Sequence, residues 1–320
     1  MSRYHNRTKS NQFKLVFGVI AFSFGLLIAP VTFSHEVLFI KEANTPFQDK
    51  ILQSIVNELQ SSDKKIVIDS QNVGSITRKQ IILKAPDLII TLGSKAAHSQ
   101  NIATFPVLHT LIPESSYSIL AECNKIDCDA GKPIYGLYLD QPVQRQLNLL
   151  KLLLPGRRSP GLLTASFSAK KAAEFGLQAK KSNYNLHSAL IENEQQLPHQ
   201  FNKLLEEMDV FIVLPDPLIH NRQTIPHLLL TTYRYNIPVI GFSHAYVNAG
   251  AVAAIYSSPE QIAQKIADLI KKILSTNPPP PGNYPNINFE AAINRNVARS
   301  LGFNFPDEQT LKAKLLLLEQ

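Results

Sequence analysis

The sequence predicts an α/β protein with two doubly wound lobes, each built on a parallel sheet and joined to the other by a hinge. Three observations support this fold class. The chain has 320 residues, which is room for about two domains. Short aliphatic or β-branched runs alternate with amphipathic stretches, as in parallel sheets that are covered by helices. The alternation occurs in two blocks, which are separated by one amphipathic helix expected between Pro142 and Pro155.

The first 34 residues have the pattern of a secretory signal peptide. A cationic leader, Met1 to Lys14, precedes an uncharged run of 16 residues from Leu15 to Pro30. The small residues Thr32 and Ser34 favour cleavage after Ser34. An uncleaved membrane anchor stays open, because the run can be extended to 19 residues and a bilayer span needs about 20. Export to the periplasm is the expected localisation.

Composition and charge exclude several classes of protein. A hydrophobic content of 44% excludes a wholly disordered chain, and two cysteines exclude a disulfide scaffold. The formal charge of +7 includes four cations of the leader, so the mature chain would carry only +3. The other basic pairs are expected at helix ends or beside strands, where solvated surface explains them. We therefore expect no nucleic-acid partner.

Cys123 and Cys128 stand five positions apart in a chain that is expected to be exported. An oxidising compartment favours a disulfide that closes a small surface loop, and free thiols are the alternative. A metal site would need two further ligands, and no histidine lies in this segment. The sequence also lacks GxGxxG, Walker, GxSxG and HExxH motifs. We expect no metal, no cofactor and no catalytic site.

The first block, 35–139, is expected to form the first lobe. Its strands are predicted at 36–40, 65–69, 87–91, 105–109 and 134–139, and a helix over 45–59 carries Phe47, Ile51, Ile55 and Leu59 on one stripe.

The second block, 140–243, is expected to form the second lobe. It opens with the connecting helix, in which Val143, Leu147, Leu150 and Leu154 recur at helical spacing. Strands are predicted at 161–165, 187–191, 209–214 and 238–242, and helices at 169–181 and 224–235. The segment 244–276 is expected to return to the first lobe through a helix over 259–274. The remainder, 277–320, is predicted to be a proline-rich spacer followed by one or two short docking helices.

Two doubly wound lobes create a crevice, and ligands meet the carboxyl ends of strands in such folds. The turn Gly93-Ser94-Lys95 follows the third strand, where Gly93 permits close backbone approach and Ser94 can cap the next helix. Its N–H groups could hold a carboxylate or a phosphate, and a plain turn is the alternative. Asp216 lies at the carboxyl end of 209–214 and could face the crevice, although capping within Pro-Asp-Pro explains it as well.

Several stretches together resemble the bacterial ABC transporter substrate-binding proteins of the tryptophan- and phenylalanine-binding type. They are PDLIITLGSKAA (86–97), FPVLHTLIP (105–113), IYGLYLDQPVQRQLNLLKLLLPG (134–156), DVFIVLPDPL (209–218), IPVIGFSHAYVNAGAVAAIY (237–256) and INRNVARSLGF (293–303). The ordered set spans nearly the whole mature chain. It is also similar to a divergent proteobacterial branch of this family.

The resemblance implies a monomeric periplasmic binding protein of the class I fold, which closes on a small-molecule ligand and presents it to an ABC permease in the inner membrane. It implies that Gly93 and Ser94 receive a ligand carboxylate, that Asp216 meets an amine, and that Thr110 lines the first lobe. A second acidic position of the family falls on Ala245 here.

The change at Ala245 puts an ordinary α-amino-acid ligand in doubt, because an ammonium held by one carboxylate is less well compensated than one held by two. We expect Tyr138, Ser243, His244 and Tyr246 to contact a more neutral or aromatic ligand instead. The hinge is expected at 138–141 and 242–246. An exported sensor or adaptor with a degenerate pocket is the alternative function. An enzyme would require His244, Asp216 and Ser94 to converge.

Overall fold

The computed structural model describes residues 34–42, 46–60, 66–99, 105–118, 120 and 132–319. The predicted leader and the pair Cys123 and Cys128 lie outside these ranges, so cleavage and the disulfide stay predictions. Among the described residues, no helix is long and apolar enough to cross a membrane. Ser34–Gln320 form one unit, which contains two sheets.

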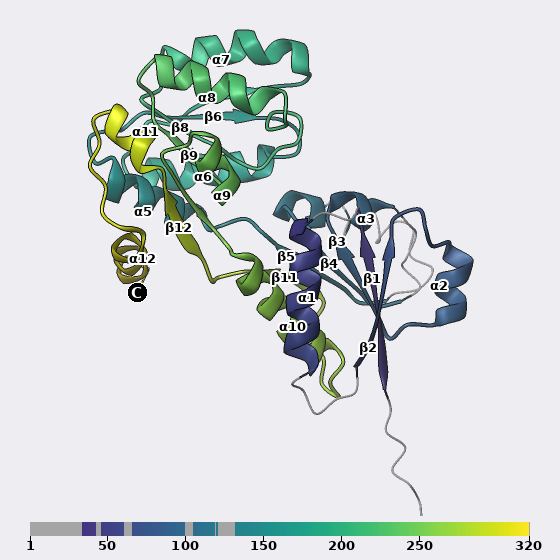
Figure 1. Cartoon of the computed structure of the whole chain (residues 1–320). Helices are drawn as coiled ribbons and strands as arrows, with labels where there is room; N and C mark the ends of the chain where they lie inside the picture. Colours follow the sequence, from purple (N-terminus) through teal and green to yellow (C-terminus); the bar gives the residue numbers. More distant parts are fainter. Residues whose placement is uncertain are drawn as a thin grey trace, which may run out of the picture. The chain divides into compact units, whose positions relative to one another are not determined.

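The first sheet has six parallel strands in the order β11-β5-β4-β3-β1-β2 (Figure 1). The strands are β1 (His35–Lys41), β2 (Ile66–Asn72), β3 (Leu88–Leu92), β4 (Val107–Ile112), β5 (Ile134–Tyr138) and β11 (Gly282–Pro285). The central strands β3 and β4 are almost wholly buried and mostly aliphatic, because both faces of a parallel sheet are covered by helices. Helices α1 (Pro46–Gln60) and α10 (Pro259–Ile273) share one core with the sheet, and α2 (Arg78–Lys84) and α3 (Ser94–His98) share the other.

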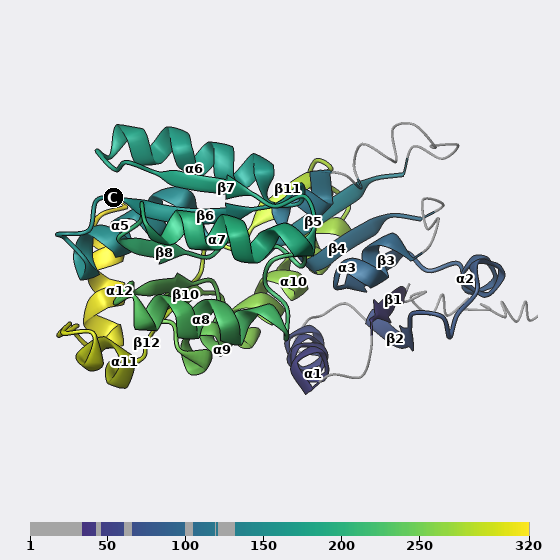
Figure 2. The same cartoon turned by 90° about the horizontal axis from the view of Figure 1, so that it is seen from above.

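The second sheet repeats this order with strands β12-β10-β9-β8-β6-β7, of which only β12 runs antiparallel to its neighbour. Its strands are β6 (Pro160–Thr164), β7 (His187–Leu190), β8 (Val210–Ile212), β9 (Val239–Gly241), β10 (Ala253–Tyr256) and β12 (Glu290–Ile293). Helices α5 (Val143–Leu153), α6 (Ala169–Lys181) and α12 (Glu308–Leu317) contribute to one core. Helices α7 (Leu197–Leu205) and α8 (Thr224–Arg234) contribute to the other, and α9 (His244–Ala249) and α11 (Arg295–Ser300) are short. Figure 2 shows α12 beside α5 and β12.

The predicted fold class is confirmed, and each predicted strand overlaps an observed one. On α1 the structure buries Ile51, Ile55 and Leu59 as predicted, but Phe47 is 46% exposed and Gln48 is buried in its place. The second sheet extends beyond the expected boundary at Ser243, because β10 and β12 belong to it. The segment 277–320 was expected to be a spacer and a docking segment, yet it supplies an edge strand to each sheet.

The chain passes between the two sheets at three places. It does so between β5 and α5, between β10 and α10, and between β11 and β12. The first passage matches the hinge expected at 138–141. The second hinge expectation, 242–246, is wrong, because β9, α9 and β10 all belong with the second sheet and the chain leaves it only after Tyr256.

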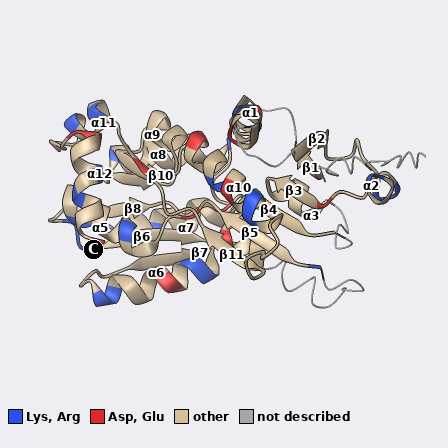
Figure 3. Ribbon diagram, turned by 90° about the horizontal axis from the view of Figure 1, so that it is seen from below, with Lys and Arg blue, Asp and Glu red and all other residues tan. Residues whose placement is uncertain are grey.

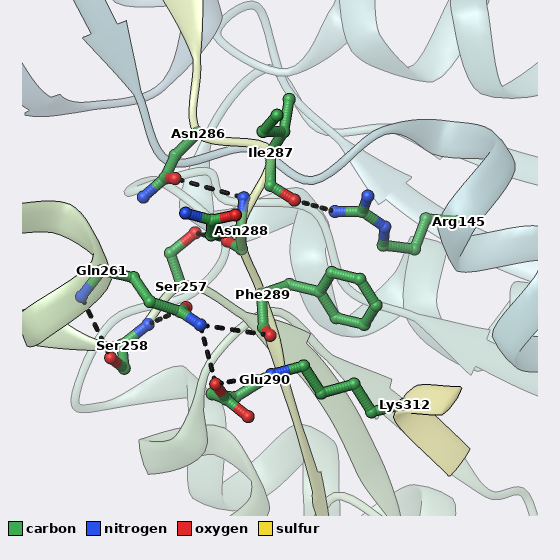
Figure 4. Close-up of polar contacts among 10 residues, drawn as sticks. All are labelled: Arg145, Ser257, Ser258, Gln261, Asn286, Ile287, Asn288, Phe289, Glu290 and Lys312. Carbon is green, nitrogen blue, oxygen red and sulfur yellow. Dashed lines mark hydrogen bonds and ion pairs between the residues drawn. The ribbon is translucent and has the colours of Figure 1, made fainter. Parts of the chain in front are cut away.

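Side-chain hydrogen bonds tie the three passages together. Gln141 Nε2 donates to Ser257 Oγ at 3.0 Å, and this hydroxyl donates to the carbonyl of Asn288 at 2.8 Å. Arg145 Nη1 donates to Gln141 Oε1 at 2.8 Å and to the carbonyl of Ile287 at 3.1 Å. Figure 4 shows the guanidinium of Arg145 directed at Ile287, with Ser257 and Asn288 nearby. Each passage is thus held by a partner from another passage.

Arg145 also fastens the end of the chain to this junction. Its Nε and Nη2 lie 2.5 and 2.6 Å from the two carboxylate oxygens of Glu319, which is a bidentate pair. Its guanidinium carbon lies 4.0 Å from the centroid of the Phe289 ring (Figure 4). The Arg145 side chain is only 6% exposed, whereas that of Glu319 is 24% exposed, so the buried guanidinium meets a partly solvated carboxylate.

Replacing Arg145 should destabilise the whole unit. Arg145→Met removes the guanidinium that pairs with Glu319 and donates to Gln141 and to the carbonyl of Ile287, and we expect the free energy of unfolding to fall by about 2 to 3 kcal/mol in urea denaturation. The matched control is Arg295→Met, because Arg295 pairs with Glu308 at 2.8 Å but both side chains are about half exposed. That change should cost under about 1 kcal/mol. Equal losses in the two variants would contradict the role assigned to Arg145.

Candidate functional site

A cavity of 230 Å³ lies where the carboxyl ends of strands from both sheets meet near the passages. Its apolar wall consists of Leu111, Pro113, Leu139, Leu214, Pro215, Phe242, Ile255 and Tyr256. Its polar lining consists of Asp140, Gln141, Gln146, Lys171, Ser243 and Ser257. Most of the lining is therefore apolar, and a few polar groups interrupt it, as is common in small-molecule sites.

A second cavity of 160 Å³ adjoins the first and is more strongly charged. The two cavities share Asp140, Lys171, Leu214 and Pro215. The smaller one is further lined by Glu114, Ser115, Ser168, Lys170 and Glu174. Together the cavities form a crevice that has an apolar inner part and a charged outer part.

Lys171 connects the two lobes across this crevice. Its Nζ lies 3.1 Å from Glu114 Oε2, on the segment after β4, and 3.0 Å from Glu174 Oε2, on its own helix α6. Figure 3 shows basic residues at both ends of α6 with an acidic residue between them. Because two carboxylates flank Lys171, its positive charge is already compensated within the protein.

Asp140 is the buried carboxylate of the crevice. It is 9% exposed, lines both cavities, and accepts a hydrogen bond at Oδ2 from the Glu114 backbone N–H at 2.8 Å. Burial raises the pKa of the Asp140 carboxyl above its usual value. Within the described ranges, Asp140 makes no ion pair, and the charge of Lys171, which pairs with Glu114 and Glu174, only partly offsets the effect of burial on the Asp140 pKa. A cationic group in the cavity would supply the missing partner.

The predicted turn at Gly93 does hold a carboxylate, but the carboxylate belongs to the protein. The backbone N–H of Lys95 donates to Glu42 Oε1 at 2.5 Å. Gly93 has a φ of 100°, and a Cβ there would collide with the Glu42 carboxylate, so this close approach requires glycine. Gly93 occupies the N-cap position of α3, and the expected capping by Ser94 is wrong.

Thr110 and Asp216 are buried and serve the framework of their lobes. Thr110 Oγ1 donates to the carbonyl of Thr91 at 2.9 Å, within the first sheet. Asp216 is 2% exposed and accepts from the N–H and the hydroxyl of Ser168, at 3.0 and 2.8 Å, and from the Leu218 N–H at 3.1 Å. Asp216 caps no helix, because turn residues follow it and α8 begins only at Thr224. Neither side chain lines the two cavities.

The aromatic and histidine candidates lie around the crevice with different roles. Ser243 lines the larger cavity, and its hydroxyl accepts from the Tyr246 N–H at the start of α9. His244 is exposed, with its ring centroid 5.7 Å from that of Tyr256. Tyr246 is buried, and its hydroxyl lies 2.9 Å from Nδ1 of His220. Burial, followed by the charge of Glu114, raises the pKa of the Tyr138 hydroxyl at the end of β5.

The polar candidates do not converge on a reactive centre. Asp216 binds Ser168, the carbonyl of Ser94 is 2.7 Å from His98 Nδ1, and His244 Nδ1 is 3.2 Å from Asn248 Nδ2. In the described part of the chain, no group of three His, Cys, Asp or Glu residues could hold a metal ion. The arrangement can bind a molecule, and these contacts assemble no nucleophile with a base.

Of the nine predicted residues, Ser243 alone lines one of the two cavities. Sequence reasoning missed Asp140, Gln146, Lys171 and Tyr256. Asp140 follows the carboxyl end of β5, and Lys171 lies in the first turn of α6, the helix after β6, so the strand-end rule that selected Gly93 could also have selected them.

Asp216 should matter for stability. Asp216→Ala leaves the buried N–H and hydroxyl of Ser168 without their acceptor, so we expect the free energy of unfolding to fall by about 2 to 3 kcal/mol. Asp216→Asn keeps an acceptor oxygen and should cost less. Urea denaturation measures both changes, and an Asp216→Ala variant as stable as the parent would contradict this role.

Two buried histidines should make the protein less stable in acid. Burial lowers the pKa of His220 to about 3, and burial with the charge of His98 lowers the pKa of His109 to about 4, against 6.5 for an ordinary histidine. The unfolded chain therefore binds more protons than the folded one between these pKa values and pH 6.5, and stability falls as the pH drops through that window.

Each histidine can contribute up to about 1.4 kcal/mol per pH unit in this window. We expect urea denaturation at pH 7, 6 and 5 to show a steadily smaller free energy of unfolding. His220→Gln should show a shallower decline than the parent chain. An unchanged decline in that variant would contradict a neutral, buried His220.

Comparisons with known proteins agree with this architecture. A tyrosine-binding protein from Clostridioides difficile strain R20291 is 24% identical over 245 residues, which cover 72% of this chain and 69% of that protein. The ligand-free, open structure of a substrate binding protein with adhesive properties from Clostridium difficile has a TM-score of 0.67 at 20% identity, covering 86% of this chain and 97% of that one. An ABC domain from Streptococcus pneumoniae in complex with L-Trp has a TM-score of 0.61 at 18% identity, covering 87% and 98%.

The structural matches show a shared fold, and the family model decides the relationship. The model of the ABC transporter substrate binding proteins matches residues 44–315, which is most of the chain. Such proteins bind a small molecule for an ABC permease and generally work outside the cytoplasm. The family predicted from the ordered stretches is confirmed, and the protein belongs to the ABC transporter substrate-binding protein family.

Proposed function

We propose that this protein captures a small solute in the crevice between its two lobes and presents it to the permease of an ABC importer, as an exported monomer. The observation that carries the proposal is the cavity of 230 Å³, because its walls come from the strand ends of both sheets and meet at the passages. Rotation about the passages would change the distance between the walls and enclose a solute.

The lining favours a solute with an apolar or aromatic body. Phe242 and Tyr256 offer aromatic surface, and Leu111, Leu139 and Leu214 complete an aliphatic wall. An apolar cavity of about 150 Å³ suffices for a benzene-sized molecule, so 230 Å³ accommodates a ring with a short side arm. The tyrosine-binding relative and the structural neighbour in complex with L-Trp support the same size class.

Closure requires that the solute bind the closed arrangement more tightly than the open one. The solute shifts the equilibrium by that difference in affinity and by no more. The pair of Lys171 with Glu114 already spans the crevice and would help to hold the lobes together. The comparisons give no support to the alternative of an exported sensor or adaptor with a degenerate pocket.

Ligand-linked stabilisation tests the proposal. The full chain is screened by thermal shift against amino acids, aromatic amines, purines, sugars and small carboxylates, and we expect at least one class to raise the melting temperature. Tyr256→Ala removes an aromatic wall of the cavity and should weaken the binding of that solute by about fivefold or more. Tyr235→Ala is the control, because Tyr235 is 60% exposed and lies outside the cavity.

The proposal predicts that Tyr235→Ala keeps the full thermal shift. If no class of solute stabilises the chain, capture in the crevice is contradicted. If a solute stabilises the chain and Tyr256→Ala binds it as well as the parent does, binding occurs elsewhere.

A further inference from the structure

We infer that the solute is a primary amine with a ring-sized apolar body and no free carboxylate, whose ammonium group pairs with Asp140 and donates to Gln146 in the larger cavity. This inference rests on the proposed function and specifies its ligand class. Three features of the crevice support it: a buried carboxylate, a buried unpaired acceptor, and anion-binding groups that the protein itself occupies.

The first feature is the charge of Asp140. This carboxylate is 9% exposed, lines the cavity, and makes no ion pair with the described residues. A buried carboxylate is costly unless a cation and hydrogen bonds compensate it. The Glu114 N–H supplies one hydrogen bond at 2.8 Å. The ammonium of a ligand would supply the cation.

The second feature is the carboxamide of Gln146 on α5. The residue is 7% exposed and lines the same cavity as Asp140. Its Oε1 is shielded from water, and among the described residues it has no hydrogen-bond partner. A buried acceptor without a donor costs about 1 to 3 kcal/mol, which a donor on the ligand would recover. An ammonium carries three N–H donors and can serve Asp140 and Gln146 together.

The third feature is the lack of an available anion site. The turn at Gly93 lies at the same sheet edge as Leu111, because the Gly93 N–H donates to the carbonyl of Thr110. Its Lys95 N–H is taken by Glu42. The cation that lines the larger cavity, Lys171, is flanked by Glu114 and Glu174. A ligand carboxylate in the larger cavity would therefore meet Asp140 and only a cation that is already paired with two carboxylates.

Lys170, which lines the smaller cavity, does not change this balance. The residue is exposed, and its Nζ donates to Ser118 Oγ at 3.4 Å, on the outer side of the crevice. It is absent from the lining of the larger cavity, where Asp140, Gln146 and the aromatic walls meet. An amine with an apolar body thus satisfies every polar group that the inner cavity leaves open.

Matched probes separate the amine from the carboxylate. Calorimetry on the full chain compares phenethylamine, phenylalanine and 3-phenylpropionate, and then tryptamine, tryptophan and 3-indolepropionate. Within at least one ring series, we expect the amine to bind at least ten times more tightly than the amino acid, and the carboxylate to show no measurable binding. An amino acid or a carboxylate that binds as tightly as its amine overturns the inference.

Two substitutions test the assigned contacts. Asp140→Asn keeps an acceptor for the Glu114 N–H and removes the charge. It should lower the affinity for the amine at least tenfold. Gln146→Leu should lower the affinity for the amine about tenfold. Gln144→Leu, on the exposed side of the same helix, should leave this affinity unchanged. Melting temperatures of the free variants verify that they fold. Unchanged amine affinity in folded Asp140→Asn overturns the inference.

The outcomes also distinguish this inference from the proposed function. If the amines do not bind, and another class of solute stabilises the parent chain but not Tyr256→Ala, the inferred ligand class is wrong and capture in the crevice stands. If no solute of any class stabilises the chain, both fail.

Discussion

The arrangement of this protein depends on the hydrogen bonds that Arg145 and Gln141 make between the three interlobe passages. Arg145 contacts two passages and the chain end, and Gln141 bridges to Ser257 on the remaining one. Because these polar groups satisfy one another, the three passages form one hydrogen-bonded junction. A crevice walled by both sheets follows from that junction, since the strand ends of each lobe converge beside it.

Three acidic side chains of the two lobes differ in the partners that the protein itself supplies. Asp216 has three donors within its own lobe and is complete without a ligand. Glu42 fills the turn at Gly93, so a site that could receive a carboxylate carries one of its own. Asp140 accepts a hydrogen bond from the Glu114 N–H and makes no ion pair among the described residues, so its carboxylate remains available to a ligand. These three carboxylates therefore have different roles, which their hydrogen-bond donors decide.

Sequence reasoning reached the fold because hydrophobic periodicity records which face of each element is buried. The stripe of Val143, Leu147, Leu150 and Leu154 on the connecting helix is buried in one core, as its spacing predicts. Edge strands β11 and β12 escaped prediction, because the first is a short polar run beside prolines and the second is only four residues long. The site was harder to predict, because the hydrogen-bond donors to Glu42 and Asp216 lie 53 and 48 positions away in the sequence. Pairings of that range come from tertiary packing, which spacing along one chain does not encode.

The central claim is that one solute is held by both lobes at once. Hydrogen–deuterium exchange of the full chain, with and without the solute that stabilises it most, measures this directly. The account predicts slower exchange on both sides of the crevice, in 111–116 of the first lobe and in 168–174 and 242–244 of the second. Protection confined to the segments of a single lobe would contradict capture between them.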